Sequence, residues 1–382
     1  MKISRSGITA PIGFKANGIN CGIKKKNFDL GLIFSQTPAK ASVFFTSNKI
    51  QAAPIKVSKE HLKKTKFIQA IIANSGNANC FTDSIGMKYA SYASELVAKK
   101  LGIEKEKVLV ASTGVIGKPL PVEKIKKGIP VLVKGLGKDK SYEASCAIMT
   151  TDTFAKDIAV EFKIGKKLVK IGAMAKGVGM IYPQLKKHAT MLCFITTDAN
   201  ISQKALDLAL AGAVEKNFNC ISVDGCTSTN DMVAILANGL SQNKTINIGT
   251  KDFKEFSKAL DFVCFDLAKK LILDAEGATK FIKINVIGAK SDSDAKKVAF
   301  TIANSVLFKT ACFGQNPNWG RIVAAIGASG ADVKEEDIEI KFSSFKAKDI
   351  DIVVNLKSGK GEKTVYTSDL SYEYVKINAE YN

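Results

Sequence analysis

The sequence has little histidine, and this scarcity excludes several kinds of catalytic site. Only two of the 382 residues are histidine, His61 and His188. One chain therefore cannot supply a three-histidine zinc site, and a histidine-activated nucleophile would have only two candidate partners. We interpret the lysine-rich segment around His61, SKEHLKK, as a solvated helix face, and His188 as a loop residue.

Arginine is almost absent although the chain is strongly basic. The formal net charge is +20, but only Arg5 and Arg321 are arginine, and the lysines are scattered among acidic residues. Base-reading and bidentate phosphate contacts usually rely on arginine. We therefore interpret the charge as a solvated surface and expect no nucleic-acid partner. A polyanion-binding protein stays open as a less favoured hypothesis.

Long hydrophobic runs and paired cysteines are also missing. No apolar stretch approaches the roughly 20 residues that cross a bilayer, and the N-terminus lacks the apolar region of a signal peptide. None of the eight cysteines forms a C-x-x-C pair, so a zinc ribbon or a thioredoxin-like site has no support. We expect buried free thiols in a cytoplasmic protein without a membrane partner, a metal or a cofactor.

Strands and helices alternate along the chain, which predicts an α/β fold. FIQAIIAN and KVLVAS are typical of buried strands, and the helix pattern of MKYASYASELVAKKLG ends at Gly102. We expect two further helices, in STNDMVAILANG and in FKEFSKALDFVCFDLAKKLILDAEG. The pattern of predicted strands and helices changes near residue 280, after which the later strands are shorter. We therefore expect a catalytic core of residues 1–279 and a smaller C-terminal α/β domain of residues 280–382.

Two segments could carry chemistry without histidine. STGVIG follows a predicted strand, and its backbone N–H groups could hold an oxyanion, although on its own it is interpreted as a structural turn. Thr190 begins an apolar strand, for which β-propensity is the ordinary explanation. If the bond before Thr190 is cut, however, a free α-amine with a pKa near ~7.7 to 8.0 lies beside the hydroxyl and can act as its base.

Many long segments of the sequence match one enzyme family in order. They are ANSGNANCFTD, STGVIGKPLP, AIMTTDTFAK, AKGVGMI followed by ATML, VDGCTSTNDM, LANG, EGATKFIKINVIGA, KTACFGQNPNWGR and YVKINAEY. This set resembles the ornithine acetyltransferase family, whose members are also called arginine biosynthesis bifunctional proteins. The resemblance runs from about residue 7 to residue 381.

The resemblance implies an autoproteolytic acyltransferase with a layered α-β-β-α core, the fold of the aminopeptidase and ornithine acetyltransferase superfamily. The precursor would be cleaved between Ala189 and Thr190 into chains of residues 1–189 and 190–382, which stay together as an α2β2 heterotetramer. Such enzymes move acetyl from N-acetylornithine to glutamate in arginine biosynthesis, and some also use acetyl-CoA as the donor.

The resemblance also assigns residues to roles. Thr190 matches the nucleophile, and Thr113 and Gly114 match the oxyanion pair. The residues that match the family's substrate contacts are Thr150 or, less favoured, Thr151, together with Lys176, Thr190, Glu276 and Asn378.

The chain departs from the family pattern at a few positions. The link QLKKH before Ala189 is longer than usual, Cys226 replaces an acid, Asn316 replaces an aspartate and Ala275 replaces a glycine. The alternative function is an N-terminal-nucleophile aminopeptidase or amidase of the same superfamily, in which water instead of glutamate accepts the acyl group.

Overall fold

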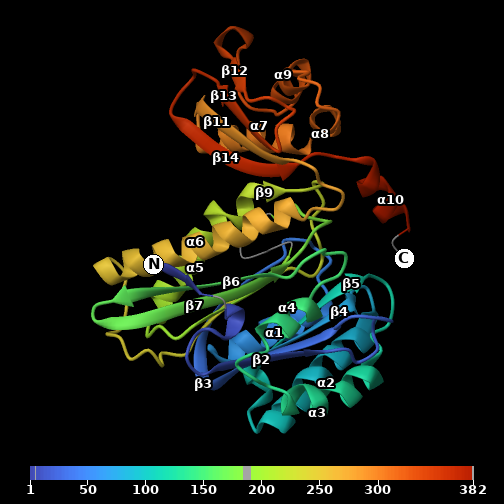
Figure 1. The fold of residues 1–382 in the computed structure, drawn as a ribbon, viewed down its shortest axis with the longest axis vertical. Coiled ribbons are helices and arrows are strands. Elements are labelled where there is room, and N and C mark those ends of the chain that lie inside the picture. The colour runs from blue at the N-terminus through green and yellow to red at the C-terminus, as the bar shows by residue number, and fades with distance from the viewer. Residues whose placement is uncertain (5, 184–190, 381–382) are drawn as a thin grey trace. The chain divides into compact units, whose positions relative to one another are not determined.

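The computed structural model describes residues 1–4, 6–183 and 191–380 (Figure 1). The contacts divide the chain into two compact units. The first consists of Met1–Gly177, Pro183–Asn219 and Thr227–Leu267. The second consists of Val178–Tyr182, Cys220–Cys226 and Ala268–Asn382.

A nine-stranded sheet forms the centre of the first unit. Its order is β1-β6-β7-β8-β10-β3-β4-β5, with β2 paired to β3. The strands are β1 (Lys2–Ser4), β2 (Phe14–Ile19), β3 (Leu30–Phe45), β4 (Phe67–Asn77), β5 (Val108–Val115), β6 (Lys156–Ile164), β7 (Lys167–Lys176), β8 (Leu192–Thr197) and β10 (Met232–Ala237). The two strands predicted from FIQAIIAN and KVLVAS are thereby confirmed as β4 and β5.

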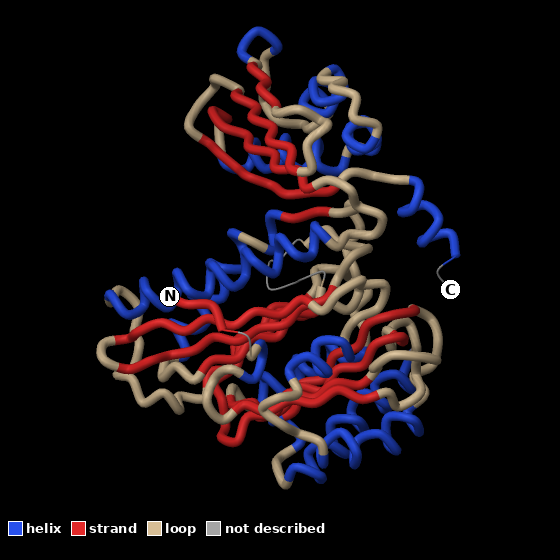
Figure 2. The backbone as a smooth tube through the Cα atoms, viewed as in Figure 1, coloured by secondary structure: helices blue, strands red, loops and turns tan. Residues whose placement is uncertain are grey.

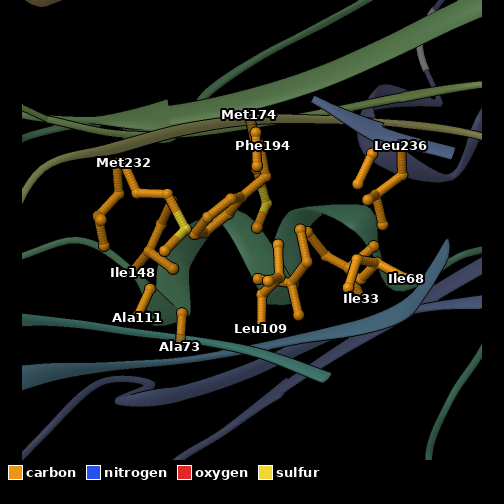
Figure 3. Packing of buried hydrophobic residues seen from close by; sticks show 14 of the residues in the cluster. Ile33, Ile68, Ala73, Leu109, Ala111, Ile148, Met174, Phe194, Met232 and Leu236 are labelled. Atoms are coloured by element: carbon orange, nitrogen blue, oxygen red, sulfur yellow. The ribbon is translucent and has the colours of Figure 1, made fainter. Parts of the chain in front are cut away.

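Strand β3 is long enough to belong to two layers. Its first half pairs with β2 and β4, its second half pairs with β10, and the register with β4 shifts between Phe34 and Ala39. The sheet therefore folds over on itself, as the two red layers in Figure 2 show. Apolar side chains from both layers meet between them, among them Ile33 and Leu109 on one side and Met174 and Phe194 on the other (Figure 3).

Helices cover the outer faces of both layers. α1 (Ala53–Lys64), α2 (Asp83–Leu101) and α3 (Val122–Lys134) pack on the layer that contains β4 and β5. α5 (Gln203–Lys216) and α6 (Lys251–Leu273) lie along the other layer (Figure 1), where Phe256 of α6 packs against Phe162 of β6. The short helix α4 (Ser141–Ala147) contributes Ala144 to the inner core. This is the α-β-β-α arrangement that the resemblance implied.

Two local expectations were wrong. The segment STNDMVAILANG does not form a helix, because Met232–Ala237 is the fully buried strand β10, parallel to β8 and antiparallel to β3. His61 is not on a solvated face: it is 4% exposed, and its Nδ1 lies 2.7 Å from the carbonyl oxygen of Val108. Next to it, Ser58 Oγ lies 2.9 Å from both the nitrogen and the oxygen of Val110. Helix α1 thus seals the outer edge of β5.

The second unit is a smaller α/β structure. Its sheet has the order β12-β13-β11-β14-β9. The strands are β9 (Ile221–Ser222), β11 (Phe281–Ala289), β12 (Glu339–Phe342), β13 (Asp349–Asn355) and β14 (Gly361–Ser368), and the helices are α7 (Asp292–Asn304), α8 (Val306–Phe313), α9 (Gly320–Gly327) and α10 (Tyr372–Glu380). Val298 and Ile302 of α7 share an apolar core with Ile284 of β11. The predicted smaller C-terminal α/β unit is confirmed, and it also contains two short segments from earlier in the chain.

Candidate active site

The predicted oxyanion turn lies where strands β4 and β5 end. Gly114 has a φ of +130°, a conformation that side-chain-bearing residues rarely adopt. A Cβ atom at this position would lie 2.4 Å from the carbonyl carbon of Gly76 in the neighbouring strand. The close approach of the two backbones therefore requires glycine, and it fixes the path of the chain beside Thr113.

Two asparagines hold this turn in place. Asn74 accepts a hydrogen bond of 2.6 Å from the hydroxyl of Ser112. The amide of Asn230 donates to the carbonyl oxygens of Ser112, at 2.9 Å, and of Ala78, at 2.6 Å. Both asparagines lie in segments that carried the family resemblance. The sequence predicted no role for them, because the hydrogen-bond partners of a side-chain amide are defined only in the folded chain.

Lys176 brings three of the predicted residues together. It is the last residue of β7 and only 7% exposed. Its ammonium group donates to the hydroxyl of Thr150, at 2.8 Å, and to that of Thr113, at 3.3 Å. Thr151, the other threonine considered for this place, is the half-buried residue that follows. The structure thus forms a cluster of one cation and two hydroxyls within the first unit.

A buried carboxylate that the sequence prediction missed supports this cluster. Asp152 accepts hydrogen bonds from Lys156 Nζ at 2.7 Å, from the N–H of Thr150 at 2.9 Å and from the N–H of Gly177 at 3.0 Å. Burial by itself would raise the pKa of Asp152, but the positive charges of Lys176 and Lys156 outweigh it and lower the pKa to about 2. Asp152 is therefore ionised. It holds the backbone of Thr150, which belongs to the cluster, and the backbone of Gly177, which follows Lys176. The sequence pattern that could have indicated this ion pair is an acid followed four residues later by a lysine.

Thr190 and Ala189 lie outside the described residues, as do His188 and the rest of the QLKKH link. The chain is described again from Met191, which is buried and accepts a hydrogen bond of 2.7 Å from the N–H of Met232. Leu192 then begins β8 and is paired in register with Lys176 of β7. Strand β8 therefore begins next to Lys176, at the C-terminal end of β7.

Glu276 and Asn378 contact each other within the second unit. The amide of Asn378 donates to Glu276 Oε2 at 2.8 Å and to the carbonyl oxygen of Tyr374 at 3.0 Å. The N–H of Glu276 donates to the carbonyl oxygen of Val178 at 3.0 Å. A Cβ atom at Gly179 would lie 2.4 Å from Glu276 Oε2, so the glycine leaves room for the carboxylate.

Asp224 is a second residue that sequence reasoning missed. It accepts hydrogen bonds from the N–H of Met180 at 2.6 Å, from the N–H of Ile181 at 3.0 Å and from the hydroxyl of Tyr374 at 3.2 Å. Burial and the charge of Asp224 raise the pKa of Tyr374, so the phenol stays a proton donor. Asp224 thereby ties the AKGVGMI segment to helix α10, which carries Asn378.

The described residues contain no group of three or more His, Cys, Asp or Glu side chains placed to hold a metal ion. Within the same part of the chain, no helix is long and apolar enough to cross a membrane. The predicted site residues form two groups, with Thr113, Thr150 and Lys176 in the first unit and Glu276 and Asn378 in the second. Their catalytic roles stay predictions.

Comparison with known proteins decides the family. The model described as ArgJ family matches residues 15–348 and 342–382. The chain belongs to the ArgJ family. It is 45% identical to the arginine biosynthesis bifunctional protein ArgJ of Caldanaerobacter subterraneus, over 100% of both chains. It is 46% identical to the glutamate N-acetyltransferase of Methanocaldococcus jannaschii, again over 100% of both chains.

Solved structures of ArgJ proteins also resemble the chain. The arginine biosynthesis bifunctional protein argJ of Bacillus halodurans is 37% identical, with a TM-score of 0.46 over 48% of this chain and 97% of that one. The ornithine acetyltransferase of Mycobacterium tuberculosis, solved in complex with ornithine, is 37% identical, with a TM-score of 0.45 over 48% of this chain and 98% of that one.

Proposed function

We propose that this ArgJ family member is a glutamate N-acetyltransferase of arginine biosynthesis. It moves the acetyl group of N2-acetylornithine to glutamate and produces ornithine and N-acetylglutamate. The observation that carries the proposal is the 46% identity to a glutamate N-acetyltransferase over the whole of both chains. The cluster around Lys176 supports it, because a buried cation beside two hydroxyls suits an anionic substrate or intermediate.

The nucleophile of the reaction is Thr190, released as an N-terminal residue by cleavage of the Ala189–Thr190 bond. Its α-amine takes the proton of the hydroxyl as the oxygen attacks the acetyl carbonyl carbon. The tetrahedral intermediate collapses, the C–N bond breaks, and the amine of ornithine leaves with a proton. Glutamate then attacks the acetyl-threonine ester through its amine, forms the new amide and restores the hydroxyl. Two half-reactions through one acyl-enzyme give ping-pong kinetics.

Thr113 and Gly114 stabilise the oxyanion of both tetrahedral intermediates. A donor fixed before the reaction begins is worth about 2.7 to 4 kcal/mol of transition-state stabilisation. The close approach of Gly114 to Gly76 supports this role, because tight packing of the two backbones restricts the positions that the N–H donors of the turn can take.

Substrate recognition uses charges of both signs. Ornithine and glutamate carry a carboxylate, for which the ammonium group of Lys176 and the hydroxyl of Thr150 are suitable partners. The carboxylate of Glu276, oriented by the amide of Asn378, suits a positively charged amine. Acetyl-CoA is a second candidate donor of the acetyl group, and no resident cofactor takes part.

The assembly in this proposal is an α2β2 heterotetramer in the cytoplasm. Its chains are residues 1–189 and 190–382, produced from one precursor.

The test is a turnover assay on the purified protein with N-acetylornithine and glutamate. We expect ornithine and N-acetylglutamate to accumulate in equal amounts. Release of acetate in place of N-acetylglutamate would assign the chain to the aminopeptidase or amidase alternative, and folded protein without any turnover would refute the proposal.

A further inference from the structure

The second half of β3 has a free edge. Residues 41–45 pair only with β10 among the described strands, since the ladder of β3 with β4 involves Leu30–Phe34, Ala39 and Lys40. The N–H of Ala41 donates to the carbonyl oxygen of Lys66 at 2.9 Å, and its carbonyl accepts from Gln203 Nε2 at 2.9 Å. The backbone groups of Ala41 therefore point away from β10.

The backbone groups of alternate residues in an antiparallel strand point to the same side. Val43 and Phe45 therefore also direct their N–H and C=O groups away from β10, and Thr46, one residue later, donates back to Asp231 beside β10 at 3.0 Å. Among the residues that the structure describes, no backbone or side-chain partner occupies these outward groups of Val43 and Phe45. They form an unpaired row of donors and acceptors.

A groove of about 900 Å³ lies along this edge. All five residues from Ala41 to Phe45 line it. Side chains of a strand alternate between its two faces, so five consecutive residues can line one groove only along the strand's edge. The walls include Leu208 of α5 and Ile248, each 49% exposed, and Leu62 of α1. The groove thus offers apolar walls beside a free strand edge.

The rim of the groove is positively charged. It carries four lysines and one acid, namely Lys59, Lys63, Lys66, Lys204 and Asp207. Desolvation and the neighbouring charge of Lys63 lower the pKa of Lys59, whose ammonium group lies 5.4 Å from the ring centre of Phe45. An acidic partner would relieve this repulsion.

We propose that the free edge of β3 binds an extended, acidic segment of a partner polypeptide as an additional strand. The backbone of the segment pairs with Val43 and Phe45, its apolar side chains contact the walls, and its carboxylates meet the lysine rim. A second copy of this chain fits less well, because edge-to-edge pairing about a two-fold axis would bring the same lysines together. The edge of β5 differs, because α1 covers it through Ser58 and His61, whereas no helix supplies such contacts to Val43 and Phe45 among the described residues.

The probe is a fluorescein-labelled six-residue peptide of alternating glutamate and valine, added to the full-length protein and followed by fluorescence anisotropy. We expect saturable binding that weakens as salt is added. Peptides methylated on the three valine nitrogens or on the three glutamate nitrogens separate strand pairing from charge attraction. The N–H groups of alternate residues in a strand point to the same side, so only one of the two sets can pair with β3. Strand pairing therefore requires that one methylated peptide loses binding and the other keeps it. Absent binding, or equal binding of both methylated peptides, would overturn the proposal.

Protein variants locate the site. Val43→Pro removes the outward N–H at an edge position, where proline is tolerated, and should abolish peptide binding without changing transferase activity or the melting temperature. Lys63→Glu should weaken binding about fivefold, as expected for one exposed charge pair, whereas Lys56→Glu, an exposed position of α1 outside the groove, should not. Equal effects of these two charge reversals on peptide binding would contradict the assignment of the binding site to the groove. If Val43→Pro instead reduces the size of the assembly in analytical ultracentrifugation, the edge is a contact between copies and the proposal fails.

Discussion

The ammonium group of Lys176 lies 2.8 Å from the hydroxyl of Thr150, and the carboxylate of Asp152 accepts the N–H of that same threonine at 2.9 Å. A cation and an anion therefore hold Thr150 from two sides, by its side chain and by its backbone. Because the first unit forms this arrangement on its own, it can be tested by substitutions within that unit.

Lys176→Met should lower kcat/KM for N-acetylornithine by at least about tenfold. The change removes the ammonium group proposed to hold the substrate carboxylate, and a charge-assisted hydrogen bond of this kind is worth about 1.5 to 3 kcal/mol. It also removes the bonds to Thr150 and Thr113 and leaves Asp152 with one positive neighbour fewer. Steady-state assays of ornithine release measure the effect. Lys167→Met, at the exposed start of the same strand, is the matched control and should keep wild-type kinetics. Equal losses in the two variants would show that Lys176 acts only through the stability of β7.

Gly114→Ala should reduce kcat about a hundredfold or more, the size of effect seen when an oxyanion donor is displaced. The new methyl group would meet the backbone of Gly76 at 2.4 Å, and backbone cannot move aside as a flexible side chain can. Gly102→Ala is the control, because Gly102 also has positive φ, +68°, but nothing lies within 4 Å of its added Cβ. Thermal unfolding should show a loss of stability in both variants, and only Gly114→Ala should lose activity in the fraction that remains folded.

The buried Asp152 should make stability depend on pH in the acid range. Its pKa is lowered from 3.8 to about 2 in the folded protein, so the unfolded chain binds its proton first as the pH falls. The contribution, about 2 kcal/mol, is complete above about pH 4 and is lost as the pH falls through about 2. Urea unfolding of wild type and Asp152→Asn at a series of pH values measures it. The difference between the two proteins should shrink below pH 4, and a constant difference would contradict the assigned pKa.

Thr190→Ala should leave one uncleaved chain without transferase activity. Intact mass spectrometry of the wild type should show two fragments, residues 1–189 and 190–382, because cleavage supplies the α-amine that serves as base. A fully active wild-type preparation that contains only the uncut chain would refute the proposed chemistry. The same measurement tests whether the longer QLKKH link permits cleavage.

Gly179→Ala should raise KM for substrate. The added methyl group would overlap the carboxylate of Glu276, which would have to turn away from Asn378. The atoms that the new methyl group meets are at the end of a long side chain that can rotate away, so we expect little change in the melting temperature. Gly249→Ala, where nothing lies within 4 Å of the new Cβ, is the control. Unchanged KM in both variants would mean that the position of Glu276 does not matter for binding.

The helices predicted correctly are those whose sequence pattern depends only on residues close together in the chain. Helix α2 ends at Gly102 with a φ of +68°, as the terminal glycine indicated, and the long amphipathic segment forms α6. Strand β10 was mistaken for a helix because all six of its residues are buried on both faces, so its sequence shows no alternation. The roles of Asp224 and Asn230 could not be predicted either, because their partners are distant in the sequence and meet only in the folded chain. Asp152 has two partners close in the sequence, Thr150 and Lys156, but its bond to the N–H of Gly177 forms only on folding.

Strand β3 is hydrogen bonded to β2 and β4 through its first half and to β10 through its second. Neither layer of the first unit can therefore lose this strand without unravelling the pairing of the other. We expect the two layers to unfold in one cooperative transition, with the ladder amides of β3 among the last to exchange their hydrogens for deuterium.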